Sequence, residues 1–151
     1  MTLDRAGVER LLPQRPPLLL VDRVLSASLG DGRRLVAALE IRGDEPVLSG
    51  HFPGRPVWPG SYTIEGLAQS CALLGRLLAP AGERTPPAEA LALVAAVKVK
   101  LVRPVVPPVL LTYHVAHTHA VDPIHRFAVE ASVDGALVAQ GTLDVIVREA
   151  E

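Results

Sequence analysis

The sequence predicts an α+β domain in which an antiparallel β-sheet wraps around one long, buried helix. Two observations support this fold class. The chain runs from β-type segments through a single long helical segment and back to β-type segments. The apolar face of a sheet and an apolar helix must both be buried, and packing one against the other buries both. The turn signals Gly30-Asp31-Gly32 and Asp134-Gly135 each separate two apolar runs, which is typical of β-hairpins.

The first forty residues predict a short helix and two paired strands. Apolar side chains recur at helical spacing within residues 3–12, and Pro13 ends this segment because proline disfavours helix in the residue before it. The apolar runs at residues 18–24 and 34–42 are predicted to be the first strands, joined by the glycine turn.

A shaped loop and one long helix form the centre of the chain. Residues 49–60 contain three prolines and three glycines, which excludes a helix or a central strand there. Residues 61–79 contain no proline and predict a helix, with Ser61 as its N-cap and Pro80 beyond its end. Apolar residues fall on every face of this helix, so we expect protein to surround it on nearly all sides.

The rest of the chain predicts a polar loop followed by four strands. Residues 81–89 form the loop and are the best candidate for disorder. The predicted strands are residues 91–102, 109–117, 126–133 and 137–147. Within the first of them, Lys98 and Lys100 alternate with valines, which places both lysines on one face.

Composition and charge exclude several classes of protein. The length of 151 residues suits one domain, and we expect a single domain over residues 1–151. The formal net charge of −1 and the five aromatic residues argue against a nucleic-acid-binding protein. Cys71 is the only cysteine, so neither an intramolecular disulfide nor a cysteine-based zinc cluster is expected. The sequence shows no secretory signal or membrane span, which predicts a cytoplasmic protein without membrane contact.

Two titratable residues in the central region predict acid–base chemistry. His51 lies in the rigid loop, where an imidazole can act as a general base near neutral pH. Glu65 follows in the first turns of an apolar helix, where burial favours a protonated carboxyl group that can act as a general acid. The N–H groups of Gly60 and Ser61 would stabilise negative charge on a carbonyl oxygen. These groups suit β-elimination from a hydroxyacyl thioester, although their spacing alone fits a purely structural histidine and glutamate as well.

The segment GHFPGRPVWPGSYTIEGLAQS (residues 50–70) strongly resembles the signature of the β-hydroxyacyl-acyl carrier protein dehydratases, members of the hotdog-fold superfamily. Three further stretches are similar to the same family in the same order: LLPQRPPLLLVDRV (11–24), KVKLVRPVVP (98–107) and FAVEASVDGALVAQG (127–141). The resemblance implies a hotdog fold. It also implies a lyase that converts 3-hydroxyacyl thioesters on acyl carrier protein into trans-2-enoyl thioesters, in fatty-acid or polyketide or aryl-polyene biosynthesis, without a metal or diffusible cofactor.

The resemblance assigns roles to single residues. His51 and Glu65 match the family's catalytic pair, and Gly60 matches the glycine whose N–H binds the thioester carbonyl. A glutamate at the acid position is typical of the plain dehydratases, whereas the related dehydratase-isomerases carry aspartate. Further substrate-site residues are expected in the loop and the helix, at Phe52, Trp58, Pro59 and Gln69. Gln69, four positions after Glu65, is expected to orient the acid.

The resemblance also implies partners. The family builds its active sites across a dimer interface, which implies a homodimer or a trimer of dimers, or a heterodimer with a paralogue. The acidic surface of acyl carrier protein could meet Lys98, Lys100 and Arg103, although an ordinary solvated strand face explains these residues equally well. Two other functions stay open: an acyl thioesterase or coenzyme A hydratase on the same fold, and a non-catalytic acyl-binding subunit. The presence of both catalytic residues argues against the last.

Other notable side chains have simpler interpretations. His114, His117 and His119 resemble a metal cluster, but in a regular strand only His117 and His119 share a face and no cysteine or nearby carboxylate completes a site. We therefore expect a solvated strand end and no metal. Cys71 is interpreted as a small buried hydrophobe and Tyr62 as a packing residue.

Overall fold

The computed structural model describes residues 1–80, 82 and 90–149, and its elements follow the predicted order. The helices are α1 (Arg5–Leu11) and α2 (Gly60–Leu78), with a short 3₁₀ helix, η1 (Pro46–Ser49), between β2 and α2. The strands are β1 (Arg23–Ser28), β2 (Arg34–Ile41), β3 (Ala90–Leu101), β4 (Val109–Val121), β5 (Ile124–Val133) and β6 (Ala136–Glu149). Apart from Gly82, the predicted loop at residues 81–89 lies outside the described residues.

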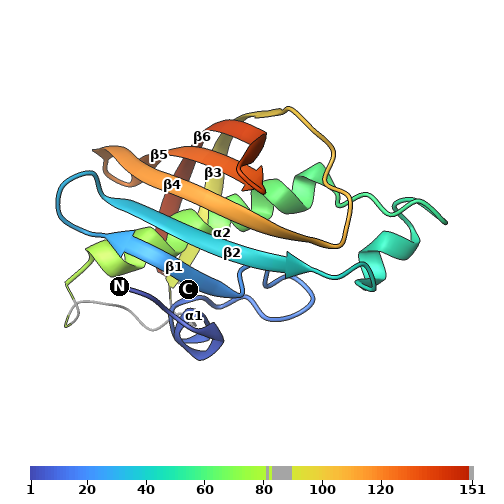
Figure 1. Ribbon diagram of the computed structural model, residues 1–151. Coiled ribbons are helices and arrows are strands. Elements are labelled where there is room, and N and C mark those ends of the chain that lie inside the picture. The colour runs from blue at the N-terminus through green and yellow to red at the C-terminus, as the bar shows by residue number, and fades with distance from the viewer. Residues whose placement is uncertain (81, 83–89, 150–151) are drawn as a thin grey trace.

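The strands form one sheet in the order β1-β2-β4-β5-β6-β3, and every neighbouring pair is antiparallel. The sheet curls over α2, which runs along its concave face (Figure 1). Both predicted glycine turns connect antiparallel neighbours, β1 with β2 and β5 with β6. The predicted α+β architecture is therefore confirmed.

The hydrophobic core lies between the concave face of the sheet and α2. Leu67, Leu74 and Cys71 of the helix are fully buried there. Gly66 permits the closest approach, because a Cβ atom at this position would overlap the ring of the buried Tyr113 on β4. No helix in the described part of the chain has the length and apolar character needed to cross a membrane.

The first strand is displaced from its predicted position. The prediction placed it at residues 18–24, but β1 begins only at Arg23, and most of the apolar run is a buried segment without strand pairing. Its main-chain groups bond to side chains instead. Gln69 Nε2 donates to the carbonyl oxygen of Leu18 (2.6 Å), and Leu20 N donates to Gln69 Oε1 (2.8 Å). Since these groups are already satisfied, the segment needs no neighbouring strand.

The start of α2 also differs from the prediction. The helix begins at Gly60, and its N-cap is Pro59 rather than Ser61. No side chain caps this end; instead, Tyr62 N and Thr63 N donate to the carbonyl oxygen of Pro59 (2.9 and 3.2 Å). The first N–H groups of the helix are therefore left for another acceptor.

A β-bulge in β4 overturns the predicted arrangement of its histidines. The register shifts between His117 and His119, so that His117 pairs with Phe127 and His119 with Arg126. Because Phe127 and Arg126 are neighbours in β5, their side chains point to opposite faces of the sheet, and those of His117 and His119 do the same. The expectation that these two histidines share a face is wrong, since the sequence pattern does not reveal the extra residue.

Candidate active site

The main chain closes the loop around His51 on itself. Val57 N donates to the carbonyl oxygen of His51 (2.9 Å), and Gly54 has a φ of 72°, a conformation that favours glycine. Trp58 N donates to the carbonyl oxygen of Val105 (2.8 Å), which ties the loop to the link between β3 and β4. The proline-rich and glycine-rich segment is therefore the shaped loop that the sequence predicted.

A main-chain carbonyl orients the ring of His51. Its Nδ1 lies 2.7 Å from the carbonyl oxygen of Val57. Because a carbonyl oxygen only accepts hydrogen bonds, Nδ1 carries the proton of the neutral ring and Nε2 presents its lone pair. Phe52 stacks on the ring with a centroid distance of 4.1 Å. His51 is thus held in the tautomer that a general base requires.

His51 and the N-terminus of α2 line one cavity of about 250 Å³. Gly60 and Thr63 contribute from the helix, and Leu101 from the end of β3. The end of the Leu101 side chain lies directly against Gly60, where a Cβ atom would make it shift. The cavity therefore brings a base next to the unbonded N–H groups and positive dipole end of a helix, where negative charge is stabilised.

Glu65 points to a different side of α2. Residues in an α-helix are rotated by about 100° each, which turns Glu65 roughly 140° from Gly60. Accordingly, Glu65 is not among the residues that line the His51 cavity. Its Oε1 accepts a hydrogen bond from Gln69 Nε2 (3.1 Å), so the expected contact between acid and amide is present. Within one chain, however, the structure does not bring His51 and Glu65 together.

The other residues predicted for the substrate site lie in different environments. Trp58 lines the His51 cavity and is 4% exposed, and its Nε1 has no hydrogen-bond partner among the described residues. Pro59 is buried at the start of the helix. Phe52 is 52% exposed and stacks on His51 outside the cavity lining. Tyr62 packs edge-on against Trp58, which agrees with its interpretation as a packing residue.

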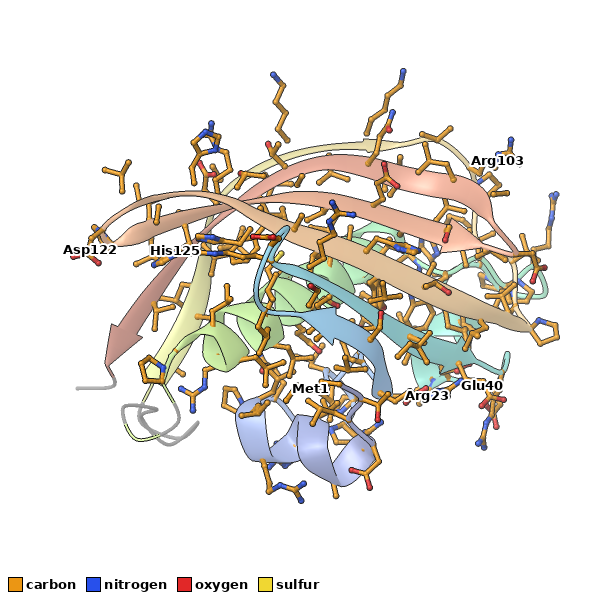
Figure 2. All side chains as sticks on the ribbon, turned by 60° about the vertical axis from the view of Figure 1, so that its left-hand side comes forward. Met1, Arg23, Glu40, Arg103, Asp122 and His125 are labelled. Atoms are coloured by element: carbon orange, nitrogen blue, oxygen red, sulfur yellow. The ribbon has the colours of Figure 1, made fainter. Side chains whose placement is uncertain are left out.

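The basic residues predicted to bind the carrier protein divide into two groups. Arg103 lines the His51 cavity and lies at one end of the molecule (Figure 2). Lys98 and Lys100 are exposed on the outer face of β3, on one side as predicted, and line a separate depression together with Arg126. Only Arg103 adjoins the candidate site directly.

The β3 strand is an apolar edge of the sheet. Among the described strands it pairs with β6 alone, and it is the last strand in the sheet order. Leu93, Val97 and Leu101 along this strand are 49%, 51% and 52% exposed. A long, apolar and unpaired strand edge is a template for association with another chain.

A second cavity, of about 420 Å³, lies at the other end of α2. His117 and His125 line it, with His117 Nε2 and His125 Nδ1 3.1 Å apart. Burial, followed by the nearby His125, lowers the pKa of His117 below its usual value. His117 is therefore partly buried in the wall of a cavity, whereas His114 and His119 are exposed, as expected of a solvated strand end. Sequence reasoning missed this site because its residues come from separate elements.

Two further findings concern metal ions and the thiol. The described residues contain no group of three or more histidine, cysteine, aspartate or glutamate side chains arranged to hold a metal ion. Cys71 is fully buried, as predicted, and burial raises the pKa of its thiol.

Comparison with known proteins identifies the family. A family model described as a FabA-like domain matches residues 12–142. The chain belongs to the FabA-like family. It is 38% identical over 150 residues to the 3-hydroxyacyl-[acyl-carrier-protein] dehydratase FabZ of Anaeromyxobacter sp. (strain Fw109-5), covering 99% of this chain and 92% of the relative. It is 35% identical to the FabZ of a Nitratiruptor species, covering 96% of this chain and 97% of the relative. The predicted membership in the dehydratase family is confirmed.

Solved structures confirm the hotdog fold. The dehydratase heterocomplex ApeI:P from Xenorhabdus doucetiae superposes with a TM-score of 0.75 at 21% identity, covering 95% of this chain and 91% of that chain. A hot-dog-like protein from Thermanaerovibrio acidaminovorans gives a TM-score of 0.61 at 13% identity, covering 79% and 83%. The fluoroacetyl-CoA thioesterase FlK gives 0.63 at 15% identity, covering 78% and 86%. Because a thioesterase shares the fold, the fold alone does not separate a FabA-like dehydratase from other hotdog enzymes.

Proposed function

We propose that this FabA-like protein dehydrates 3-hydroxyacyl thioesters carried on acyl carrier protein, in an active site that two copies of the chain build together. The observation that carries the proposal is the hydrogen bond from His51 Nδ1 to Val57, which leaves Nε2 free as a base in the cavity at the N-terminus of α2. The names of the FabZ relatives support this substrate class.

The proposed reaction is an elimination of water. His51 Nε2 removes a proton from the α-carbon of the substrate, and the electron pair moves toward the thioester carbonyl. The N–H of Gly60 and the helix dipole stabilise the negative charge that develops on the carbonyl oxygen. Glu65 protonates the β-hydroxyl group, which leaves as water while the trans-2 double bond forms. One proton is taken and one is given, so the reaction consumes no further reactant.

The acid in each proposed site comes from the other copy of the chain. Glu65 lies on the side of α2 away from the His51 cavity of its own chain, as its helical position requires. The exposed side chains of Leu93, Val97 and Leu101 make β3 the natural edge for a second copy. In a symmetric dimer the same surface of both chains meets, so that each His51 can face the partner's Glu65. A trimer of such dimers, or a pair with a paralogue, would use the same edge.

The remaining parts of the proposal concern the carrier and the conditions. Arg103 at the cavity, with Lys98 and Lys100 farther along β3, supports docking of an acidic carrier protein. Acid–base groups supply every step, so the proposed reaction uses no metal and no diffusible cofactor, and we expect it in the cytoplasm.

Mass spectrometry of the acyl group tests the reaction. Purified protein is incubated with 3-hydroxyacyl-acyl carrier protein, beside the His51→Ala and Glu65→Gln variants. We expect loss of one water with the unmodified protein and a strong reduction with either variant. Release of the free acid would instead identify a thioesterase, and an unchanged acyl group at every chain length would indicate a non-catalytic subunit.

Complementation tests whether the site is shared. When the two inactive variants are co-expressed and associate at random, half of the dimers are mixed and each carries one intact site, which restores about a quarter of the sites. Each variant expressed alone serves as the control. If co-expression restores no activity although mixed dimers are isolated, the two residues act within one chain and the shared site is wrong.

A further inference from the structure

The cavity at the C-terminal end of α2 combines apolar walls with charges of one sign. Leu12, Ala72 and Phe127 form part of its walls, and its volume of about 420 Å³ lies in the range of small-molecule sites. Apart from the thiol of Cys71, the ionisable side chains that line it are all basic: Arg33, Arg76, His117 and His125. No aspartate or glutamate is among its described lining residues. The cavity therefore attracts anions and repels cations.

Arg33 supplies a permanent positive charge beside the two histidines. It lies in the turn between β1 and β2, it is exposed, and no ion pair among the described residues includes it. Its carbonyl oxygen accepts a hydrogen bond from His117 N (3.0 Å), which fixes the turn against β4. Asp31 in this turn and Asp122 in the turn between β4 and β5 do not line the cavity. The guanidinium group is thus open to an anionic ligand.

The two histidines form a pair that a single proton converts into a purely donating group. His117 Nε2 and His125 Nδ1 lie 3.1 Å apart, so one ring donates a hydrogen bond to the other. In the neutral pair this leaves one N–H donor and one unprotonated nitrogen, whichever ring donates. One added proton binds to that nitrogen and leaves the hydrogen bond between the rings intact. The protonated pair then presents two N–H donors and one positive charge.

The surroundings of His117 oppose its protonation as long as no anion is bound. Burial lowers the pKa of His117 below its usual value, and the positive charges of His125, Arg33 and His119 lower it further. A negative charge placed between Arg33 and the pair would have the opposite effect, because it stabilises the protonated imidazole. Binding of an anion here should therefore be accompanied by uptake of a proton from solvent.

We propose that this cavity binds a small free carboxylate with an apolar body, whose two oxygens accept hydrogen bonds from Arg33 and from the protonated His117–His125 pair. A carboxylate has acceptors only, which suits these donors. Its apolar body would lie against Ala72 and Phe127, a contact that an inorganic anion cannot make. Space is open there, since a Cβ atom on Gly75 would meet no atom within 4 Å.

The proposed site is separate from the cavity of the elimination reaction. Figure 2 shows His125 toward the end of the sheet opposite Arg103, which lines the His51 cavity. No covalent bond of the ligand forms or breaks, and the inference concerns binding alone. Its test is therefore independent of the proposed dehydratase function.

Calorimetric titrations with benzoate and benzamide test the proposal, because the two molecules have nearly the same shape and only benzoate is charged. Near neutral pH we expect benzoate to bind about tenfold more tightly, the effect of roughly one charge-assisted hydrogen bond. Its affinity should rise about tenfold as the pH falls from about 8 to about 7, because one proton is bound with it. Titrations in two buffers of different ionisation enthalpy measure that proton directly. Equal binding of the two molecules, binding of neither, or a benzoate affinity independent of pH would overturn the proposal.

Substitution of the arginine tests the permanent charge. Arg33→Gln should weaken benzoate binding about tenfold at every pH, while benzamide binding stays the same. Arg34→Gln is the matched control, since the neighbouring Arg34 lines a separate depression that contains none of these groups. If Arg33→Gln retains the full affinity for benzoate, the carboxylate is not held by this residue and the proposed site is wrong.

Substitution of the histidine pair tests the source of the proton uptake. Replacing both His117 and His125 with phenylalanine keeps two rings in the cavity wall and should remove the pH dependence of benzoate binding. The same replacement at the exposed His114 and His119 should preserve it. Circular dichroism shows whether the variants fold, and if the first does not, the proton count of the unmodified protein decides. A folded His117 and His125 variant that still binds benzoate with uptake of a proton would contradict the assignment.

Discussion

The two ends of helix α2 carry cavities built from different parts of the chain. At the N-terminal end the decisive groups belong to the main chain: the carbonyl oxygen of Val57, which orients His51, and the N–H of Gly60. At the C-terminal end the polar groups are side chains, above all Gln14 and the His117–His125 pair. Main-chain groups keep their positions through most substitutions, whereas side chains change with a single substitution. Most substitutions should therefore leave the orientation of the His51 ring unchanged, whereas a single substitution can change the polar groups of the second cavity.

The largest expected effect is the loss of activity when His51 is removed, and it should be the same for short and long acyl chains. His51→Ala should lower kcat by roughly 10²–10⁴ for short and long substrates alike, because the α-carbon occupies the same position whatever the length of the chain. Steady-state dehydration rates with a short and a long 3-hydroxyacyl-acyl carrier protein measure this. His114→Ala, which removes an exposed imidazole that does not line the His51 cavity, is the control and should retain the rate. A near-normal rate for His51→Ala would remove this residue from the mechanism.

Placing charge on the exposed edge strand β3 should have the next largest effect on activity. Replacing both Leu93 and Val97 with lysine places charge on an edge that a second copy would bury, so the dimer should dissociate and activity should fall with it. Sedimentation analysis gives the oligomeric state, and circular dichroism shows whether the chain remains folded. The same replacement at Val121 and Ile124, which are exposed beside the β4–β5 turn, is the matched control. A folded, active monomer would contradict the shared site.

Two glycines of α2 should respond oppositely to the same substitution. Gly66→Ala would force a methyl group against the buried Tyr113 ring and should cost about 1–3 kcal/mol of the free energy of unfolding. Gly75→Ala meets open space in a helix and should raise that free energy by up to about 1 kcal/mol. Urea titrations measure both variants. Equal destabilisation by the two would mean that α2 does not pack on the sheet as described.

The smallest expected effect is a dependence of stability on pH at the second cavity. Burial and the nearby His125 hold the pKa of His117 below its ordinary value, so the unfolded chain binds this proton first as the pH falls. The contribution of His117 to stability is therefore complete above about pH 6.5 and declines as the pH falls below that value. His117→Gln should make the fall in unfolding free energy shallower. Parallel pH curves for the two proteins would show that His117 is not coupled to folding.

The predictions of secondary structure were confirmed where they depended on a few neighbouring residues. Glycine turns marked the hairpins, and the proline-rich stretch marked the loop before a long helix that contains no proline. The prediction failed at residues 18–24, where apolar strand-type residues are satisfied by Gln69 and Tyr113, which lie far away in the sequence. It failed again at His119, because a β-bulge has no sequence signal in this strand and reverses every face assignment beyond it.

The candidate site likewise has features that the sequence predicts and features that only the structure shows. The motif around His51 and the helix position of Glu65 are visible in the sequence, and with them the family. The contact between Gln69 and Glu65 follows from helical spacing and was also predictable. The tautomer of His51 was not, because it depends on a carbonyl oxygen that the folded loop brings next to the ring.

The sequence by itself determined the order of strands and helix, the reactive residues and the family to which they belong. These features depend on residue type and on short-range spacing, which the chain carries in any conformation. Only the tertiary structure decided that the carbonyl oxygen of Val57 orients His51, and that Gln14, His117 and His125 meet in one cavity. Such groupings arise from helix rotation, strand register and the curl of the sheet, which depend on contacts between residues far apart in the chain.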